Sequence, residues 1–111
     1  MKWKFIIRRK YILILIAKFK IKPEYREEFI NLSEGMLEPS RSEEGCIHYE
    51  LLQDPFAPDQ FTFYEKWKSQ LDLDLHFEQH YFNEFVNSIQ RIIEGEGDIK
   101  TFEVTNEATI T

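Results

Sequence analysis

Four short runs of the chain have the composition and length of β-strands. Residues 11–21, 46–54, 61–67 and 99–105 are rich in β-branched or aromatic residues and are bounded by Pro, Gly or Asp. The segment between the second and third runs carries two prolines and an aspartate, which is typical of a turn and predicts a hairpin.

Helical spacing separates the other runs. Pro23 begins a pattern that continues to about residue 38, with acidic residues in its first turn, where the helix dipole favours them. Its apolar stripe consists of Tyr25, Phe29, Leu32 and Met36. A second helical segment begins after Ser69, a predicted N-cap, and extends to about residue 94. Apolar residues outside its main stripe leave two alternatives open: a second contact face, or a break near residues 78–80.

The predicted order of elements is β-α-β-β-α-β, which indicates an α+β, ferredoxin-like fold with a four-stranded antiparallel sheet and helices on one face. The first strand is apolar on both of its faces. A sheet face left bare by the helices would therefore expose a large apolar patch. We expect a second copy of the chain to cover it, giving a homodimer through the sheet faces.

The composition fits one globular domain of 111 residues, with 42% apolar and 31% charged residues. We place this domain at residues 11–106, between a basic N-terminal tail at 1–10 and a C-terminal tail at 107–111. Residues 1–10 hold five of the 14 basic residues and no acidic residue, so the rest of the chain is strongly acidic. Nucleic-acid binding, which needs clustered Lys and Arg, is not expected.

The apolar run at residues 12–17 is too short for a membrane span or an ordinary signal sequence, so no membrane insertion is expected. Cys46 is the single cysteine and cannot form a disulfide within the chain, which favours a cytoplasmic location. Cys46 has no base beside it in the sequence and is interpreted as a buried small residue. His48, on the second strand, is interpreted as a sheet-surface or interface residue.

The sequence "HFEQH" places His76 and His80 four residues apart, a spacing at which two histidines on one helix point the same way. A zinc protease motif needs a glutamate directly after the first histidine, and Phe77 occupies that position. No third His or Cys follows at a usable spacing, so no metal is expected. His80 is predicted to lie on the helix surface, whereas His76 is close enough to a helix flank to reach a pocket.

Glu65 is the second candidate, because it alternates with Phe63 and Trp67 on one face of the third strand. A carboxylate on an apolar face needs a partner when it is buried. A histidine of the following helix would make a carboxylate–histidine pair fit for general base catalysis. Arg41, Lys66 or a backbone N–H would instead make the contact purely structural.

Several segments together resemble the antibiotic biosynthesis monooxygenase (ABM) domain family over roughly residues 11–106. They are the run E-P-S-R-x-E-x-G-C at 38–46, the run Y-E-x-W at 64–67, and a histidine nine positions after that tryptophan. The resemblance implies a dimeric α+β barrel of ferredoxin-like protomers, each with a pocket between its sheet and its helices.

Some members of this family oxidise quinols or polyphenols with O₂ and need no metal or flavin cofactor. The resemblance therefore implies an oxidoreductase, a cofactor-independent monooxygenase of small quinol-like or polyphenol-like aromatics with O₂ as co-substrate. It implies His76 as the catalytic base or phenolate partner, Glu65 as its neighbour and Trp67 as a pocket wall. The other candidate substrate contacts are Phe63, Tyr64 and Phe82.

Other branches of the family supply alternatives. A haem-degrading branch uses an Asn on its first strand, and residues 11–21 contain none. Another branch isomerises a phosphorylated signalling sugar derivative, but no secure phosphate site is visible in this sequence. A third possibility is a dimer that binds a small ligand without turning it over.

Overall fold

The computed structural model describes residues 5–9 and 11–110. The strands and helices follow one another along the chain as β1 (Phe5–Arg9), β2 (Ile12–Lys20), a 3₁₀ turn (Pro23–Tyr25), α1 (Arg26–Ser42), β3 (Cys46–Asp54), β4 (Ala57–Trp67), α2 (Gln70–Phe77), α3 (His80–Ile89), β5 (Asp98–Val104) and β6 (Glu107–Ile110).

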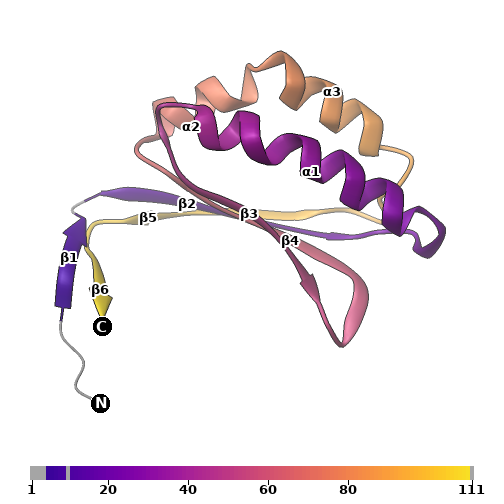
Figure 1. The fold of residues 1–111 in the computed structure, drawn as a ribbon, viewed down its shortest axis with the longest axis horizontal. Helices are drawn as coiled ribbons and strands as arrows, with labels where there is room; N and C mark the ends of the chain where they lie inside the picture. Colours follow the sequence, from indigo (N-terminus) through magenta and orange to yellow (C-terminus); the bar gives the residue numbers. More distant parts are fainter. Residues whose placement is uncertain (1–4, 10, 111) are drawn as a thin grey trace.

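The four-stranded sheet has the order β3-β4-β2-β5, and all neighbouring strands are antiparallel. All three helices lie over one face of this sheet (Figure 1). The predicted ferredoxin-like α+β fold is thus confirmed. In the register, Tyr49, Glu65, Leu15 and Thr101 form one row across the sheet, from β3 to β5. This row crosses the region where the functional side chains gather.

The core forms where the helix-facing side chains of the sheet meet the apolar stripe of α1. Phe29 of α1 is fully buried, and its ring centroid lies 4.9 Å from that of Phe61 on β4. Trp67, at the end of the same strand, is also fully buried. Aromatic side chains of this size bury much of the apolar area that holds a small domain together.

Helix α1 is longer than expected. It continues through Pro39 to Ser42, whereas the sequence predicted an end near residue 38. Proline removes one helical N–H donor and normally breaks a helix. Here the hydroxyl of Ser42 donates to the carbonyl of Glu38 at 2.8 Å, and the next cap bond runs from the Glu43 N–H to the Ser40 carbonyl. The extra turn leads into the loop before the start of β3, which lies beside the end of β4.

The second predicted helix is broken in two, which was one of the two alternatives left open by its apolar pattern. The side chain of Ser69 caps α2 by accepting from the N–H of Asp72, as predicted. Helix α2 ends at Phe77, and Gln79 has the extended backbone (φ −65°, ψ 138°) of an N-cap before α3. The break resets the helical phase, so His76 and His80 point to different environments.

Both segments expected to be tails contain strands, which corrects that part of the prediction. Strand β1 pairs antiparallel with β6, and the two form a separate ribbon at one end of the sheet (Figure 1). Glu107 of β6 accepts a hydrogen bond from the Lys66 ammonium at 2.6 Å, which ties the ribbon to β4. Residues 1–4, 10 and 111 of the two expected tails lie outside the described residues.

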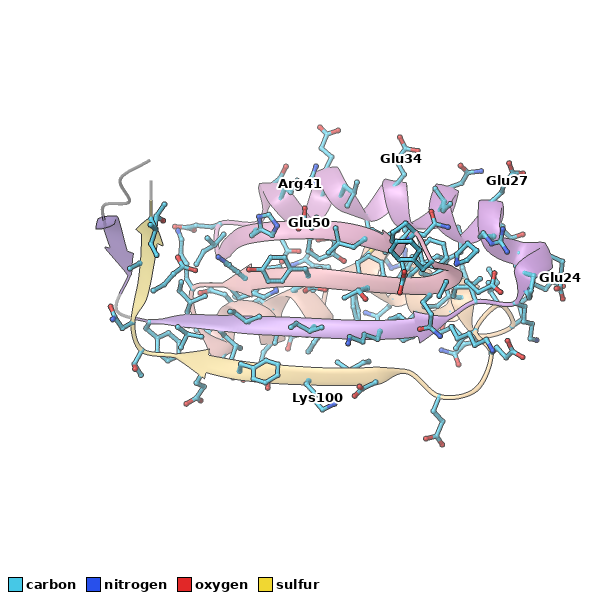
Figure 2. All side chains as sticks on the ribbon, turned by 90° about the horizontal axis from the view of Figure 1, so that it is seen from below. Glu24, Glu27, Glu34, Arg41, Glu50 and Lys100 are labelled. Atoms are coloured by element: carbon cyan, nitrogen blue, oxygen red, sulfur yellow. The ribbon has the colours of Figure 1, made fainter. Side chains whose placement is uncertain are left out.

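The second face of the sheet carries no helix, and Figure 2 looks onto it. Apolar side chains at its centre belong to β2 and β5, where Ile14 pairs with Phe102. Phe102 is 46% exposed and Leu52 on β3 is also 46% exposed. The charged residues Glu50 and Lys100 lie on the two edge strands (Figure 2).

In the described part of the chain, no helix is both long enough and apolar enough to cross a membrane.

Candidate functional site

A cavity of about 410 Å³ lies between α3 and the helix-facing side of the sheet. Six aromatic side chains line it, namely Phe19, Tyr49, Phe63, Phe77, Phe82 and Phe85. Ile99 lines it from β5 and is 58% exposed, because the helices leave this edge strand uncovered. The cavity is therefore mostly apolar and open to solvent beside β5, which suits a small flat molecule.

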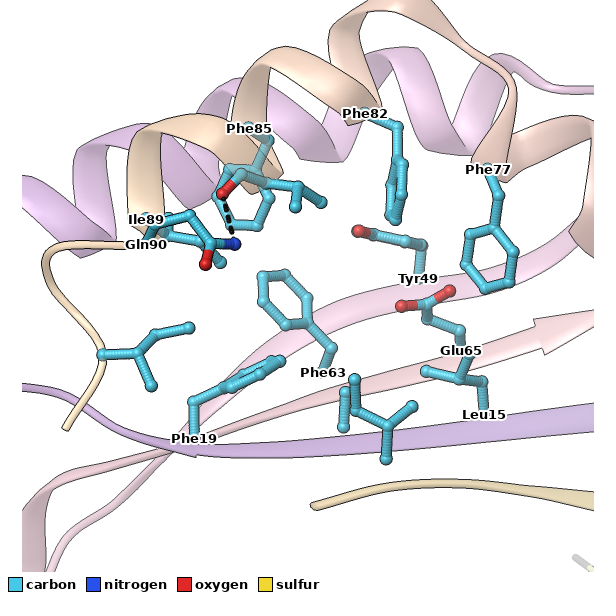
Figure 3. A pocket seen from close by; sticks show the side chains of 14 residues that line it. Leu15, Phe19, Tyr49, Phe63, Glu65, Phe77, Phe82, Phe85, Ile89 and Gln90 are labelled. Atoms are coloured by element: carbon cyan, nitrogen blue, oxygen red, sulfur yellow. Dashed lines mark hydrogen bonds between the residues drawn. The ribbon is translucent and has the colours of Figure 1, made fainter. Parts of the chain in front are cut away.

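Glu65 is the carboxylate of this cavity. Figure 3 shows its side chain rising from β4 among Tyr49, Phe77 and Leu15. It is only 5% exposed, and its Oε1 accepts a hydrogen bond from the indole Nε1 of Trp67 at 2.9 Å. This bond orients the carboxyl group from the neighbouring position on the same face of β4.

The pKa of Glu65 is raised from 4.5 to about 7, mainly by burial; the Trp67 hydrogen bond acts in the opposite direction, and the nearby charge of Glu43 adds to the increase. A carboxyl group with a pKa near 7 both accepts and releases protons at neutral pH.

Tyr49 pairs with Glu65 across β3 and β4 and also lines the cavity. Burial, followed by the charge of Glu65, raises the pKa of its phenol far above the ordinary value. Tyr49 therefore remains protonated and can donate a hydrogen bond to a bound molecule.

His76 lies behind the cavity wall and is fully buried. Its Nδ1 is 2.6 Å from Oε2 of Glu43, and its Nε2 has no hydrogen-bond partner among the described residues. Its ring stacks at a centroid distance of 4.5 Å on Trp67 and lies 5.1 Å from Phe82, which lines the cavity. Burial lowers the pKa of His76, while the hydrogen bond to Glu43 opposes this shift, so the imidazole is neutral at neutral pH.

Glu43 and Tyr81 complete a polar cluster around His76. The Tyr81 hydroxyl donates to the same Oε2 of Glu43 that His76 contacts, and it lies 3.4 Å from both Ser40 Oγ and His76 Nδ1. Burial and the Glu43 contact raise the pKa of Tyr81 above its usual range, so it remains a phenol. The cluster joins the end of α1 to α2 and to the first turn of α3.

The predicted pairing of Glu65 with a helix histidine is not what the structure shows. Glu65 binds the indole of Trp67, and the carboxylate partner of His76 is Glu43. Arg41, another predicted partner of Glu65, donates instead to the backbone carbonyl of Tyr49 at 2.9 Å. Glu65 and His76 nevertheless share Trp67, which hydrogen-bonds the first and stacks on the second.

The predicted substrate contacts divide into two groups. Phe63 and Phe82 line the cavity. Trp67 is fully buried and is not among the residues that line the cavity. Tyr64 lies on the opposite face of β4, where its ring is 5.0 Å from that of His48.

The remaining candidates lie away from the cavity. The side chain of His80 is 88% exposed and pairs with Glu84 on the surface of α3, as predicted. His48 lies on the open face of the sheet, also as predicted, with its Nε2 3.1 Å from Glu50. Burial, then the charges of Glu65 and Glu43, raise the pKa of Cys46 to about 11, so its half-buried thiol stays protonated.

A metal centre needs several ligand side chains that converge. Within the residues the structure describes, no three His, Cys, Asp or Glu side chains gather in such an arrangement. The two histidines of "HFEQH" face a buried cluster and bulk solvent, respectively.

Relatives of known sequence are similar to this chain over most of its length. An uncharacterised protein of Synechocystis, sll1783, is 37% identical over 88% of this chain and 67% of its own length. "Putative monooxygenase YcnE" of Bacillus subtilis is 31% identical over 85% of this chain and 99% of its own length.

Solved structures agree with the fold. A conserved protein of Methanosarcina mazei superposes with a TM-score of 0.81 at 31% identity, covering 84% of this chain and 92% of that one. A crystal structure described as an antibiotic biosynthesis monooxygenase superposes with a TM-score of 0.79 at 29% identity, covering 83% of this chain and 97% of that one. The model of the antibiotic biosynthesis monooxygenase family matches residues 12–88, and the chain belongs to this family.

Proposed function

We propose that this protein is a cofactor-independent monooxygenase of small quinol-like or polyphenol-like aromatics, and that Glu65 and His76 are its two proton acceptors. The observation that carries the proposal is an aromatic cavity of about 410 Å³ containing a carboxyl group whose pKa is about 7. Family membership supports the same class of reaction. The cavity volume is within the range of small-molecule sites.

In the proposed reaction the substrate supplies the electrons. Glu65 takes a proton from a phenolic hydroxyl, and the resulting phenolate reduces O₂ far more readily than the phenol does. One oxygen atom bonds to a ring carbon and the other leaves as water, so a hydroquinone and O₂ give a hydroxyquinone and water. The protein supplies the base, the orientation of the ring and an apolar cavity.

His76 is the second acceptor, because its Nε2 is buried without a partner in the described part of the chain. The rings of Phe77 and Phe82 line the cavity, and their centroids lie 6.0 and 5.1 Å from that of the imidazole. Phe77 is 38% exposed, and the proposal requires its ring to move so that a substrate hydroxyl can reach Nε2.

The experiment that tests this function measures O₂ uptake by the purified protein with a panel of hydroquinones and naphthols, with no metal or flavin added. We expect uptake with at least one member of the panel and one O₂ consumed for each substrate molecule. If the aromatics bind but no O₂ is consumed, the protein is a binding dimer rather than an enzyme.

A sugar phosphate fits the cavity less well than an aromatic does. No Lys or Arg side chain lines the cavity over the residues that the structure describes. A phosphate group buried beside Glu65 would meet a carboxylate instead of a cation, which is unfavourable in an apolar site.

We also propose that two copies of the chain associate through the face of the sheet that the helices leave open. The centre of this face is apolar, with Ile14 and Ile16 on β2 and Phe102 on β5. An exposed apolar surface of this kind is usually covered by a partner.

Replacement of Phe102 by Asp tests this association. Because Phe102 is 46% exposed in a single chain, the substitution costs the monomer little, whereas it buries a charge in the dimer. We expect the natural protein to elute as a dimer of the 13.5 kDa chain at micromolar concentration, and Phe102→Asp to elute as a monomer with unchanged circular dichroism. Phe56→Asp, on the fully exposed β3–β4 turn, is the matched control and should remain dimeric. A monomeric natural protein would refute this association.

A further inference from the structure

We propose that Glu43 and Tyr81 are positioning residues, which hold the His76 imidazole with its proton on Nδ1 and leave the Nε2 lone pair free to accept a proton from a substrate hydroxyl. The role of Nε2 as an acceptor rests on the proposed function. The tautomer itself does not, because it follows from the contacts of the ring.

The contact between Nδ1 and Glu43 determines where the proton lies. An ionised carboxylate can only accept hydrogen bonds, so Nδ1, at 2.6 Å from Oε2, must be the donor. A neutral imidazole carries one N–H, so Nε2 is then an unprotonated acceptor.

The free Nε2 is what separates this arrangement from a purely structural histidine. His76 is fully buried, yet Nε2 has no partner in the described residues. A buried polar atom left unpaired costs about 1–3 kcal/mol, and structural histidines normally satisfy both nitrogens. A nitrogen held in this state beside an aromatic cavity is ready to accept a proton from a ligand.

Tyr81 strengthens this arrangement by binding the same oxygen atom of Glu43. Its hydroxyl donates to the same Oε2 and so holds the carboxylate in place. Its own ring is fixed at the start of α3 because the helix breaks at residues 78 and 79. The side chain of Glu43 is only 15% exposed, so its negative charge acts on His76 through little water.

The same geometry stabilises the product of proton transfer. When Nε2 takes the substrate proton, the imidazolium keeps its Nδ1–H bond to Glu43, and the new positive charge faces a carboxylate. The other groups around the ring are the phenols of Tyr81 and Tyr49 and the indole of Trp67, which are neutral. Among these contacts of the ring, Glu43 is therefore the charged group that compensates the imidazolium.

The test observes the ring nitrogens of His76 directly, by ¹⁵N NMR of histidine-labelled protein without substrate. In the natural protein we expect a single neutral tautomer with the proton on Nδ1. Glu43→Leu should move most of the population to the Nε2–H tautomer and lower the His76 pKa, because Glu43 raises that pKa. Glu44→Gln, at the exposed neighbouring position, is the matched control and should change neither property.

Turnover provides the second measurement. Glu43→Leu should lower kcat about 10- to 100-fold, as loss of an orienting partner commonly does. Tyr81→Phe should lower it only a few-fold, in keeping with one hydrogen bond of about 1 kcal/mol. Both variants should bind substrate with little change in affinity.

The results separate the two proposals. A proton on Nε2 in the natural protein, or a tautomer that does not respond to Glu43→Leu, overturns the positioning role whatever the activity. Absence of O₂ uptake with the expected tautomer overturns the monooxygenase and leaves the positioning of His76 intact. If Glu43→Leu does not fold, Glu43→Met preserves the length of the side chain without an oxygen that can accept from Nδ1, and it should again shift the proton to Nε2.

Discussion

Glu65→Gln is expected to reduce O₂ uptake with hydroquinones by about 10²- to 10⁴-fold, the usual contribution of a general base. Gln has nearly the same shape, and its amide oxygen can still accept the hydrogen bond from Trp67 that orients Glu65. The substitution therefore removes the proton acceptor and leaves the cavity lining intact. Substrate affinity, measured by quenching of tryptophan fluorescence, should change by less than a few-fold.

The pH dependence sharpens this prediction. Because the base must be ionised and burial raises the pKa of Glu65 to about 7, the rate of the natural protein should rise with pH up to about 7 and then level off. The residual activity of Glu65→Gln should not show this rise with pH. Glu34→Gln, which removes a carboxylate from the exposed side of α1, is the control and should behave as the natural protein (Figure 2). Full activity of Glu65→Gln would remove Glu65 from the mechanism.

Stability should respond to the same group with a definite sign. The pKa of Glu65 is higher in the folded chain than its ordinary value of 4.5, so the folded state binds this proton more tightly. Its contribution to stability is fully present below pH 4.5 and is lost as the pH rises through about 7, a change on the order of 3 kcal/mol. In Glu65→Gln this loss disappears. The free energy of unfolding in urea should therefore rise for the variant relative to the natural protein as the pH increases.

Replacement of His76 by Asn or by Gln is the second change with a large expected effect. Asn can still place an N–H near the Nδ1 position and donate to Glu43, whereas neither amide can take a proton as Nε2 does. We expect both variants to fold and to lose about 10²- to 10⁴-fold in kcat.

His80→Asn is the matched control for these variants. It removes the other histidine of "HFEQH", whose side chain is 88% exposed, and should leave the rate unchanged. Thermal unfolding of each variant checks that the buried cluster is intact. Equal rates for the His76 variants and the natural protein would limit this histidine to a structural role.

Much of the fold could be predicted because each element has a local signal. The composition and bounding residues of 46–54 and the Ser69 cap led to the observed bounds of β3 and the start of α2. The strands at residues 5–9 and 107–110 were missed, because they pair only with each other and neither end carries a turn signal for the other. The extension of α1 through Pro39 was missed for a different reason, since proline normally ends a helix and the bonds that continue it here, from the Ser42 hydroxyl and the Glu43 N–H, carry no clear sequence signal.

The candidate site was predicted only in part. Glu65 was found because a carboxylate between Phe63 and Trp67 on an apolar strand is unusual. Its partner could not be found, since an indole two residues away on the same strand face is also an ordinary core residue. Glu43 lies 33 residues from His76, and Tyr81 lies beyond a helix break, so only the tertiary structure brings them together. Tyr81 did carry a signal, because it lies outside the apolar stripe of its helix.

Labelled oxygen provides the most direct test of the proposed monooxygenase. The protein, free of added metal and flavin, is given ¹⁸O₂ and the hydroquinone that it oxidises fastest, and the product is analysed by mass spectrometry. We predict one ¹⁸O atom in the hydroxyquinone and one in water, with the labelled product nearly absent from Glu65→Gln. A product without ¹⁸O, or labelled product formed equally by Glu65→Gln, would contradict the proposed mechanism.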